Sequence, residues 1–186
     1  MQGLPQVQYD PPMSSPRLTN LAGFLACSGL IAYAYFWVEL HEGIEPCPLC
    51  MFQRVGVGLL GLIFAAAALQ GPRAWGAKVY AALLALASLT TAAIAARHIY
   101  VQHAPPGLVP SCGAPLEYMV KVMPLTQVIA KVLAGSGECA QVNWQFLGLA
   151  MPAWVLIWAL GLGALGVVGN LRPRAPGALP AAQEGA

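Results

Sequence analysis

The sequence has little charge. It contains 9 Lys and Arg and 7 Asp and Glu in 186 residues, or 9% charged residues, against roughly 25% in an ordinary soluble domain. Hydrophobic residues make up 58% of the chain. This scarcity excludes an ordinary soluble domain, and the formal net charge of +2 is too small to predict nucleic-acid binding. We therefore expect a single-domain membrane protein that crosses the lipid bilayer several times.

The two ends of the chain lack hydrophobic periodicity. Residues 1–16 are polar and rich in proline, which predicts a disordered arm. No basic segment there leads into a short apolar core and a small-residue cleavage site, so we expect no removable signal peptide. Residues 172–186 are rich in proline and alanine and are expected to form a tail.

Between the ends lie four long apolar runs, each close to the ~20 residues that a membrane-spanning helix needs. They predict an all-α membrane protein, a four-transmembrane-helix bundle with spans at about 18–38, 48–69, 77–96 and 146–168. The connections at 39–47 and 97–145 then form two loops on one side of the membrane. Within the longer loop, residues 116–133 are apolar but interrupted by charges and a proline, which predicts a short membrane-surface helix.

Charge predicts the orientation of the bundle. Five basic residues lie on the side of the two termini and four on the other, two of which, Arg54 and Arg97, lie at span ends. The positive-inside rule therefore places both termini in the cytoplasm. The five residues on the side of the termini are Arg17, Arg73, Lys78, Arg172 and Arg174.

Five cysteines are present, and the topology sorts them. Cys27 falls in the middle of the first span, where a buried packing role is expected, whereas Cys47, Cys50, Cys112 and Cys139 fall on the outer side. Disulfides persist outside the cytoplasm. Four thiols allow three connectivities. We favour Cys47–Cys50 and Cys112–Cys139, because each pair lies within one loop, and we expect the second pair on mobile loop that a soluble protein can reach.

The first pair opens the second span. Pro48 suits the first helical position, so Cys47 is expected at the N-cap and Cys50 in the first turn. Cys47, Cys50 and Arg54 then share one helix face. The helix dipole and the Arg54 charge both favour a thiolate at Cys50. A carrier dissolved in the bilayer can reach this pair but not the loop pair.

Four motifs give the chain a resemblance to a known family. They are CPLCMFQR at 47–54, RH at 97–98 with Gln102 and PP at 105–106 before CG at 112–113, GEC at 137–139, and WQFLGLAMPAW at 144–154. In order and spacing, these motifs resemble those of the bacterial disulfide-bond formation protein B (DsbB) family over residues 18–172.

This resemblance implies a bacterial inner-membrane enzyme that reoxidises a periplasmic DsbA-type thiol oxidase and passes the electrons to ubiquinone or menaquinone. It implies that Cys112 forms the mixed disulfide with the partner and that Cys139 is its mate. Cys47 is then expected to exchange with that pair, and Cys50 to face the quinone.

Two further residues match quinone-site positions of the family. Arg54 is expected to stabilise negative charge on the Cys50 sulfur and on a quinone oxygen, although an interfacial anchor is the alternative. His98 is expected to donate a hydrogen bond or proton to the other oxygen, with a satisfied interfacial histidine as its alternative. The Cys-Pro-Leu-Cys pair and one histidine lack a convincing four-ligand set, so no metal site is predicted.

Two other functions remain open from the sequence. One is a quinone reductase resembling vitamin K epoxide reductase, in which the substrate or the direction of electron flow differs. The other is a tetraspan scaffold in which the outer cysteines form static disulfides.

Overall fold

The computed structural model describes residues 16–105 and 116–172. Residues 1–15 of the predicted arm and 173–186 of the predicted tail lie outside the described residues. Cys112 also lies outside them, and with it the predicted Cys112–Cys139 disulfide and the end of the Pro105-Pro106 motif.

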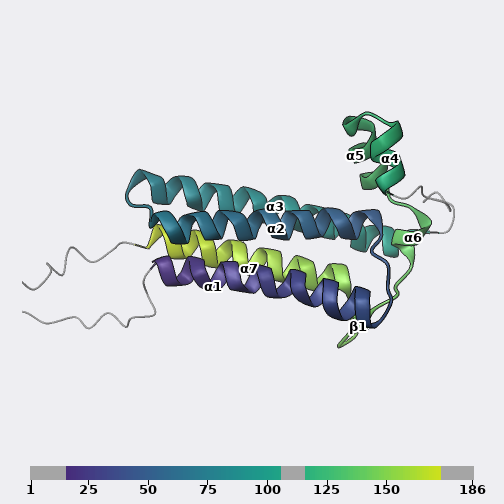
Figure 1. Ribbon diagram of the computed structural model, residues 1–186, viewed down its shortest axis with the longest axis horizontal. Coiled ribbons are helices and arrows are strands. Elements are labelled where there is room, and N and C mark those ends of the chain that lie inside the picture. Colours follow the sequence, from purple (N-terminus) through teal and green to yellow (C-terminus); the bar gives the residue numbers. More distant parts are fainter. Residues whose placement is uncertain (1–15, 106–115, 173–186) are drawn as a thin grey trace, which may run out of the picture.

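Four long helices form the body of the molecule (Figure 1). The first consists of α1 (Pro16–Ala32), which continues directly as a π-helix, η2 (Tyr33–His41); the others are α2 (Pro48–Gln70), α3 (Trp75–Gln102) and α7 (Met151–Leu171). Each is long and apolar enough to cross a membrane. The four-helix membrane fold predicted from the sequence is thereby confirmed.

Small residues let these helices pack closely. Helix α3 packs mainly on α7, and α1 mainly on α2, with α2 also against α3. The ring of Phe64, fully buried in α2, lies over glycines of two other helices: a Cβ built on Gly23 would come within 2.7 Å of it and one on Gly166 within 3.0 Å. Close approach of this kind is the usual basis of helix association in membranes.

Buried polar side chains add specific links between the helices. The amides of Asn20 in α1 and Asn170 in α7 donate to each other's oxygens at 3.1 and 3.0 Å. The Ser88 hydroxyl in α3 donates to the Ala159 carbonyl in α7 at 2.7 Å. Unpaired polar groups are costly in a low-dielectric interior, and within the described residues no buried side-chain nitrogen or oxygen lacks a partner.

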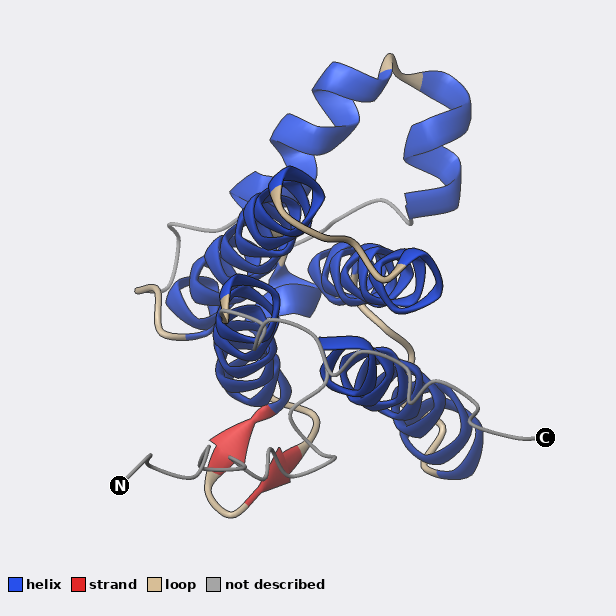
Figure 2. Ribbon diagram, turned by 90° about the vertical axis from the view of Figure 1, so that its left-hand side faces the viewer, coloured by secondary structure: helices blue, strands red, loops and turns tan. Residues whose placement is uncertain are grey.

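The start of α1 and the end of α7 lie at one end of the bundle, and the short elements gather at the other, which we call the loop end (Figure 1). These elements are α4 (Leu116–Val122), α5 (Leu125–Ala134), α6 (Gly137–Ala140), and the antiparallel strands β1 (Gln145–Phe146) and β2 (Leu149–Ala150). Seen along the bundle, the α4–α5 hairpin and the strands lie on opposite sides of it (Figure 2).

The boundaries differ from the predicted ones in four places. The expected surface helix at 116–133 is divided into α4 and α5 at Pro124, which has no N–H to continue a helix. Helix α7 begins at Met151, because residues 145–150 form the hairpin. Helix α3 continues beyond residue 96 and contains His98, and the π-helix contains Glu39, which the sequence placed in a loop.

Contact between α3 and α7 yields a direct test of the packing. A Cβ on Gly163 would lie 2.5 Å from the Ser88 Cβ, whereas one on Gly161 would have nothing within 4 Å. We expect Gly163→Ala to lower the free energy of unfolding by roughly 1–3 kcal/mol, as overpacking does. Gly161→Ala should leave it unchanged or slightly raised, since alanine favours a helix. Unfolding of both variants in the same detergent measures this, and equal stabilities would contradict the packing.

Candidate functional site

The start of α2 positions the first cysteine pair. Cys47 is the N-cap, with extended backbone, and Pro48 is the first helical residue, as the sequence predicted. The Cys47 sulfur accepts the backbone N–H of Cys50 at 3.4 Å, which is the bond that an N-cap side chain makes to the free donors of the first turn. Both residues are free, partly buried thiols, and their Sγ atoms lie 3.1 Å apart. The pair is therefore placed to close a disulfide within one helical turn.

A third thiol lies against this pair. Cys139 in α6 belongs to an apolar cluster against which Cys47 packs, and its sulfur accepts the Ser136 hydroxyl at 3.6 Å. The neighbouring Cys47 side chain, together with burial, raises the pKa of the Cys139 thiol. A neutral thiol is a poor nucleophile, so Cys139 has to lose these contacts or its proton before it reacts.

The location of Cys139 corrects the sequence-based expectation. Cys139 was expected on accessible loop, but its side chain is only 1% exposed. It belongs to an apolar cluster with Leu49 of α2 and Val101 of α3. Residue Arg97 of α3 helps to hold this region, because its guanidinium donates to the carbonyls of Leu133 and Ala134 at the end of α5. The long loop thus folds back onto the start of α2.

His98 connects three of these elements. It is 2% exposed. Its Nδ1 lies 2.9 Å from the side-chain nitrogen of Gln53 in α2, and its Nε2 lies 3.1 Å from the carbonyl oxygen of Cys139 in α6. With the amide in this orientation, Gln53 donates to Nδ1 and His98 donates from Nε2, so one neutral tautomer satisfies both bonds. The same Nε2 lies 3.8 Å from the Cys47 sulfur.

Gln53 was not singled out in the sequence as a site residue. Its position one helical turn after Cys50 is a local signal that it faces the same side. Its partner His98 is 45 residues away in the chain, so no spacing rule links the two. His98 itself, expected to serve a quinone oxygen, has both ring nitrogens engaged by protein groups.

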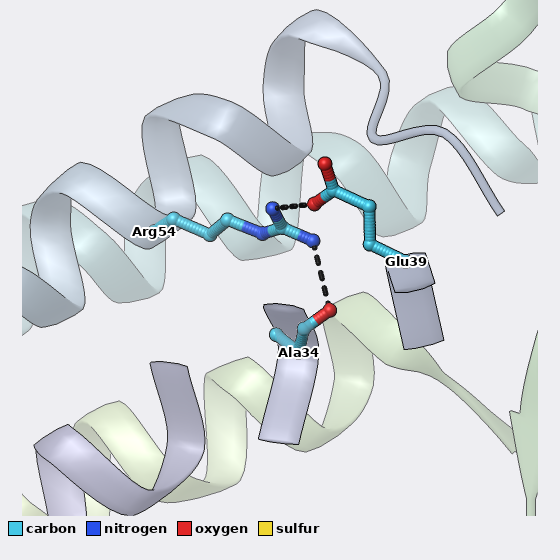
Figure 3. Close-up of polar contacts among 3 residues, drawn as sticks. All are labelled: Ala34, Glu39 and Arg54. Carbon is cyan, nitrogen blue, oxygen red and sulfur yellow. Dashed lines mark hydrogen bonds and ion pairs between the residues drawn. The ribbon is translucent and has the colours of Figure 1, made fainter. Parts of the chain in front are cut away.

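Arg54 reaches across from α2 to the first helix (Figure 3). Its Nη1 donates to the Glu39 carboxylate at 2.5 Å and its Nη2 to the Ala34 carbonyl at 3.2 Å. Arginine has five N–H donors, so these two bonds fix the guanidinium without exhausting it. Glu39 is a second residue that the sequence reasoning missed, because it looked like part of an acidic loop.

The Glu39 carboxylate also changes the electrostatics that the sequence suggested. The sequence predicted that the Arg54 charge acts on the Cys50 sulfur and a quinone oxygen, and it gave Arg54 no acidic partner, but Arg54 forms an ion pair with Glu39. An opposite charge at this distance offsets part of the field that the guanidinium exerts on its surroundings. Arg54 is therefore a fixed hydrogen-bond donor with a partly neutralised charge.

These side chains surround a cavity of about 1000 Å³ at the loop end. Cys47, Cys50, Gln53, Arg54 and His98 all line it. Most of the remaining wall is apolar and includes the aromatic residues Tyr33, Trp144, Phe146, Trp154 and Trp158. A large apolar cavity with a few convergent polar groups is typical of a binding site for a small organic molecule.

The arrangement brings together five of the six site residues predicted from the sequence, all except Cys112, which lies outside the described residues. Cys47 packs against the cluster that contains Cys139, which places the third thiol next to the first pair for thiol–disulfide exchange. Sulfur and nitrogen atoms of Cys47, Cys50 and His98 also lie within 4.8 Å of one another, as metal ligands do; the absence of a metal stays a prediction.

Comparison with known proteins identifies the family. The sequence model of the family "Disulfide bond formation protein DsbB" matches residues 16–169. Disulfide bond formation protein B of Xanthomonas campestris is 45% identical over 161 residues, which cover 86% of this chain and 93% of that protein. The protein of the same name in Methylococcus capsulatus is 45% identical over 156 residues, 84% of this chain and 94% of its own. The chain therefore belongs to the DsbB family of membrane proteins of disulfide bond formation.

Proposed function

We propose that this protein reoxidises a periplasmic DsbA-type thiol oxidase and passes the electrons to a membrane quinone. Family membership supports disulfide formation as the activity. The observation that carries the rest is that Cys47 packs against the cluster containing Cys139, while Cys47 and Cys50 both line the cavity. This contact gives electrons a continuous path from the long loop to the bundle interior.

The first step takes electrons from the partner. A thiolate of the reduced partner attacks the Cys112–Cys139 disulfide at Cys112 and forms a mixed disulfide, and Cys139 leaves as the thiolate. The second thiol of the partner then attacks its own sulfur in the mixed disulfide. The partner departs as a disulfide, and Cys112 and Cys139 hold its two electrons and protons as thiols.

The second step passes the electrons to the first pair. The Cys139 thiolate attacks Cys47 in the Cys47–Cys50 disulfide, and Cys50 leaves as a thiolate; Cys112 then attacks Cys139 and releases Cys47. The second pair is oxidised again and the first pair is reduced. The Nε2 of His98 lies within 3.8 Å of the Cys47 sulfur, close enough to exchange a proton with it.

The residues around the cavity fit a quinone headgroup. The cavity volume and apolar wall suit a lipid-soluble ring. When bound, a quinone such as ubiquinone or menaquinone accepts two electrons and two protons. Arg54 would donate to one of its oxygens from a guanidinium that Glu39 and Ala34 already hold in place, so little ordering is needed at the moment of reaction. Cys50 would face the ring.

The proposed function also implies a cellular location and an orientation in the membrane. The protein is a multi-pass membrane protein with four spans. We place it in the bacterial inner membrane with both termini in the cytoplasm and the loop end facing the periplasm. The basic residues Arg17, Arg73 and Lys78, all at the opposite end of the bundle, support this orientation.

The buried contact of Cys139 generates the first test. In the reduced protein, Cys139 should react with iodoacetamide more slowly than an exposed thiol, since its pKa is raised and it is buried. Cys47→Ala removes the neighbouring sulfur that raises the pKa of Cys139 and should accelerate alkylation of Cys139, as followed by peptide mass spectrometry. Cys27→Ser, in a thiol far from the site, should leave the rate unchanged. An unchanged rate in Cys47→Ala would remove the contact from the mechanism.

The role of Cys50 is tested by turnover. Cys50→Ser deletes the sulfur that faces the cavity, and quinone reduction by the reduced partner should fall by roughly a thousandfold or more, as it does when a reactive nucleophile is lost. The mixed disulfide between Cys112 and the partner should still form, because it precedes Cys50 in the relay. Normal quinone reduction by this variant would exclude Cys50 from the path.

The role of Arg54 is tested by quinone affinity. Arg54→Ala removes the fixed donor, and we expect the KM for quinone to rise about tenfold to a hundredfold, the worth of a charged hydrogen bond. Arg73→Ala removes an exposed charge at the other end of the bundle and serves as the control. Steady-state assays over a range of quinone concentrations measure both, and an unaltered KM would reduce Arg54 to a structural anchor.

A further inference from the structure

The reduced site contains an arrangement that electron transfer does not require. Cys47, Cys50 and His98 direct two sulfurs and one nitrogen toward a common point, with all three atoms within 4.8 Å of one another. The Sγ atoms lie 3.1 Å apart, and the Cys47 sulfur lies 3.8 Å from His98 Nε2. Thiolate and imidazole are the preferred ligands of zinc.

These separations are close to those around a zinc ion. With Zn–S of about 2.3 Å and Zn–N of about 2.0 Å, tetrahedral coordination separates the ligand atoms by roughly 3.5 to 3.8 Å. The Cys47 sulfur and His98 Nε2, 3.8 Å apart, need to approach by about 0.3 Å, and the two sulfurs, 3.1 Å apart, need to separate by about 0.7 Å.

Cys139 is the residue that completes the proposed ligand set. The sequence argued against a metal because one cysteine pair and one histidine leave the set incomplete. The Cys139 sulfur lies outside the group of atoms that are within 4.8 Å of one another, but Cys47 packs against the cluster that contains Cys139, so Cys139 has to move toward the ion to bind it. A set of three cysteines and one histidine is a common structural zinc site.

The surroundings of His98 also suit a metal ligand. A histidine that binds zinc through Nε2 usually donates from Nδ1 to a neighbouring oxygen, which fixes the ring. Gln53 stands at Nδ1, and a rotation of its amide exchanges the nitrogen for the oxygen. The proton on His98 then moves from Nε2 to Nδ1, and Nε2 gives up its bond to the Cys139 carbonyl.

A cation can reach this point through the cavity. Cys47, Cys50 and His98 all line it, and so do the exposed carboxylates of Glu45 and Glu138. Two carboxylates beside an opening raise the local concentration of a divalent cation.

From these observations we infer that the reduced protein binds one Zn²⁺ through Cys47, Cys50, His98 and Cys139. Each coordinated thiol releases a proton and no electrons move. A disulfide between Cys47 and Cys50 removes two of the four ligands, so the oxidised protein does not hold the ion. Zinc therefore captures the reduced state and keeps its dithiol from being oxidised. This consequence rests on the proposed relay, whereas the binding itself does not.

Cobalt(II), a spectroscopic substitute for zinc, tests the site directly. The full-length protein in detergent is reduced with a phosphine, freed of reductant without air, and titrated with Co²⁺. We expect thiolate-to-cobalt charge-transfer bands and the visible bands of tetrahedral cobalt, saturating at one ion per chain and removed by one equivalent of Zn²⁺. The oxidised protein should give neither. Absence of tetrahedral bands from the reduced protein, or equal bands from the oxidised one, overturns the proposal.

Variants assign the ligands. Cys47→Ser, Cys50→Ser and His98→Ala should each abolish the tetrahedral spectrum at one equivalent, and Cys139→Ser should lower the charge-transfer intensity by about a third. Cys27→Ser and His103→Ala remove a thiol and an imidazole elsewhere and should change nothing. A spectrum that survives loss of Cys47 or Cys50, or is lost with Cys27, contradicts the assignment. Unchanged intensity in Cys139→Ser overturns the four-ligand set.

Variants of Gln53 distinguish a zinc site that includes His98 from metal binding by the two thiols alone. Gln53→Leu removes the partner of Nδ1 and should weaken zinc binding roughly tenfold to a hundredfold. Gln53→Glu retains an oxygen at that position and should restore the affinity. Equal affinities in the two variants contradict the role given to His98. Quinone reduction by the metal-free sample, measured in parallel, distinguishes failure of the zinc site from failure of the relay.

Discussion

The start of helix α2 is the constraint on which the rest of the site depends. Pro48 fixes the first helical residue, and the preceding Cys47 therefore has to be the N-cap, with its sulfur over the free N–H groups of the first turn. Cys50 follows one turn later on the same face. The pair consequently lies where an apolar helix meets the loop end, within reach of both a hydrocarbon-soluble molecule and the long loop.

Two sets of side-chain hydrogen bonds link the helices around Cys47 and Cys50. Gln53 and His98 tie α2 and α3 to the backbone of Cys139, and Arg54 ties α2 to Glu39 on the π-helix. In a low-dielectric interior such bonds are strong because the unpaired alternative is costly. The π-helix is itself an uncommon element that often occurs at functional sites. Here the π-helix contains Glu39, whose carboxylate binds Arg54 in the cavity wall.

The α6 segment, in contrast, is held by few contacts. Cys139 is buried, yet α6 is only four residues long, and a small set of contacts with Cys47, His98 and Ser136 holds its sulfur and backbone. Elements with few contacts open most readily. A thiol that packs against the first pair can thus still be released, as the proposed relay requires.

The sequence predicted what depends on local chemistry. The four spans follow from the length of the apolar runs, and the N-cap at Cys47 follows from Pro48. It could not predict the contact of Glu39 with Arg54 across two helices or that of Gln53 with His98 over 45 residues. Nor could it predict the burial of Cys139. All three depend on how the helices pack. The break at Pro124 was readable in the sequence, because proline interrupts a helix, but the apolar pattern on both sides of it obscured the break.

The central claim is that the thiols at the start of α2 can reduce a lipid-soluble acceptor on their own. The direct measurement is a single anaerobic turnover of the reduced protein carrying Cys112→Ser and Cys139→Ser, mixed with one equivalent of quinone. We expect one quinone to be consumed per chain and Cys47 and Cys50 to be recovered joined by a disulfide. Unconsumed quinone, with both thiols still open to alkylation, would contradict the account.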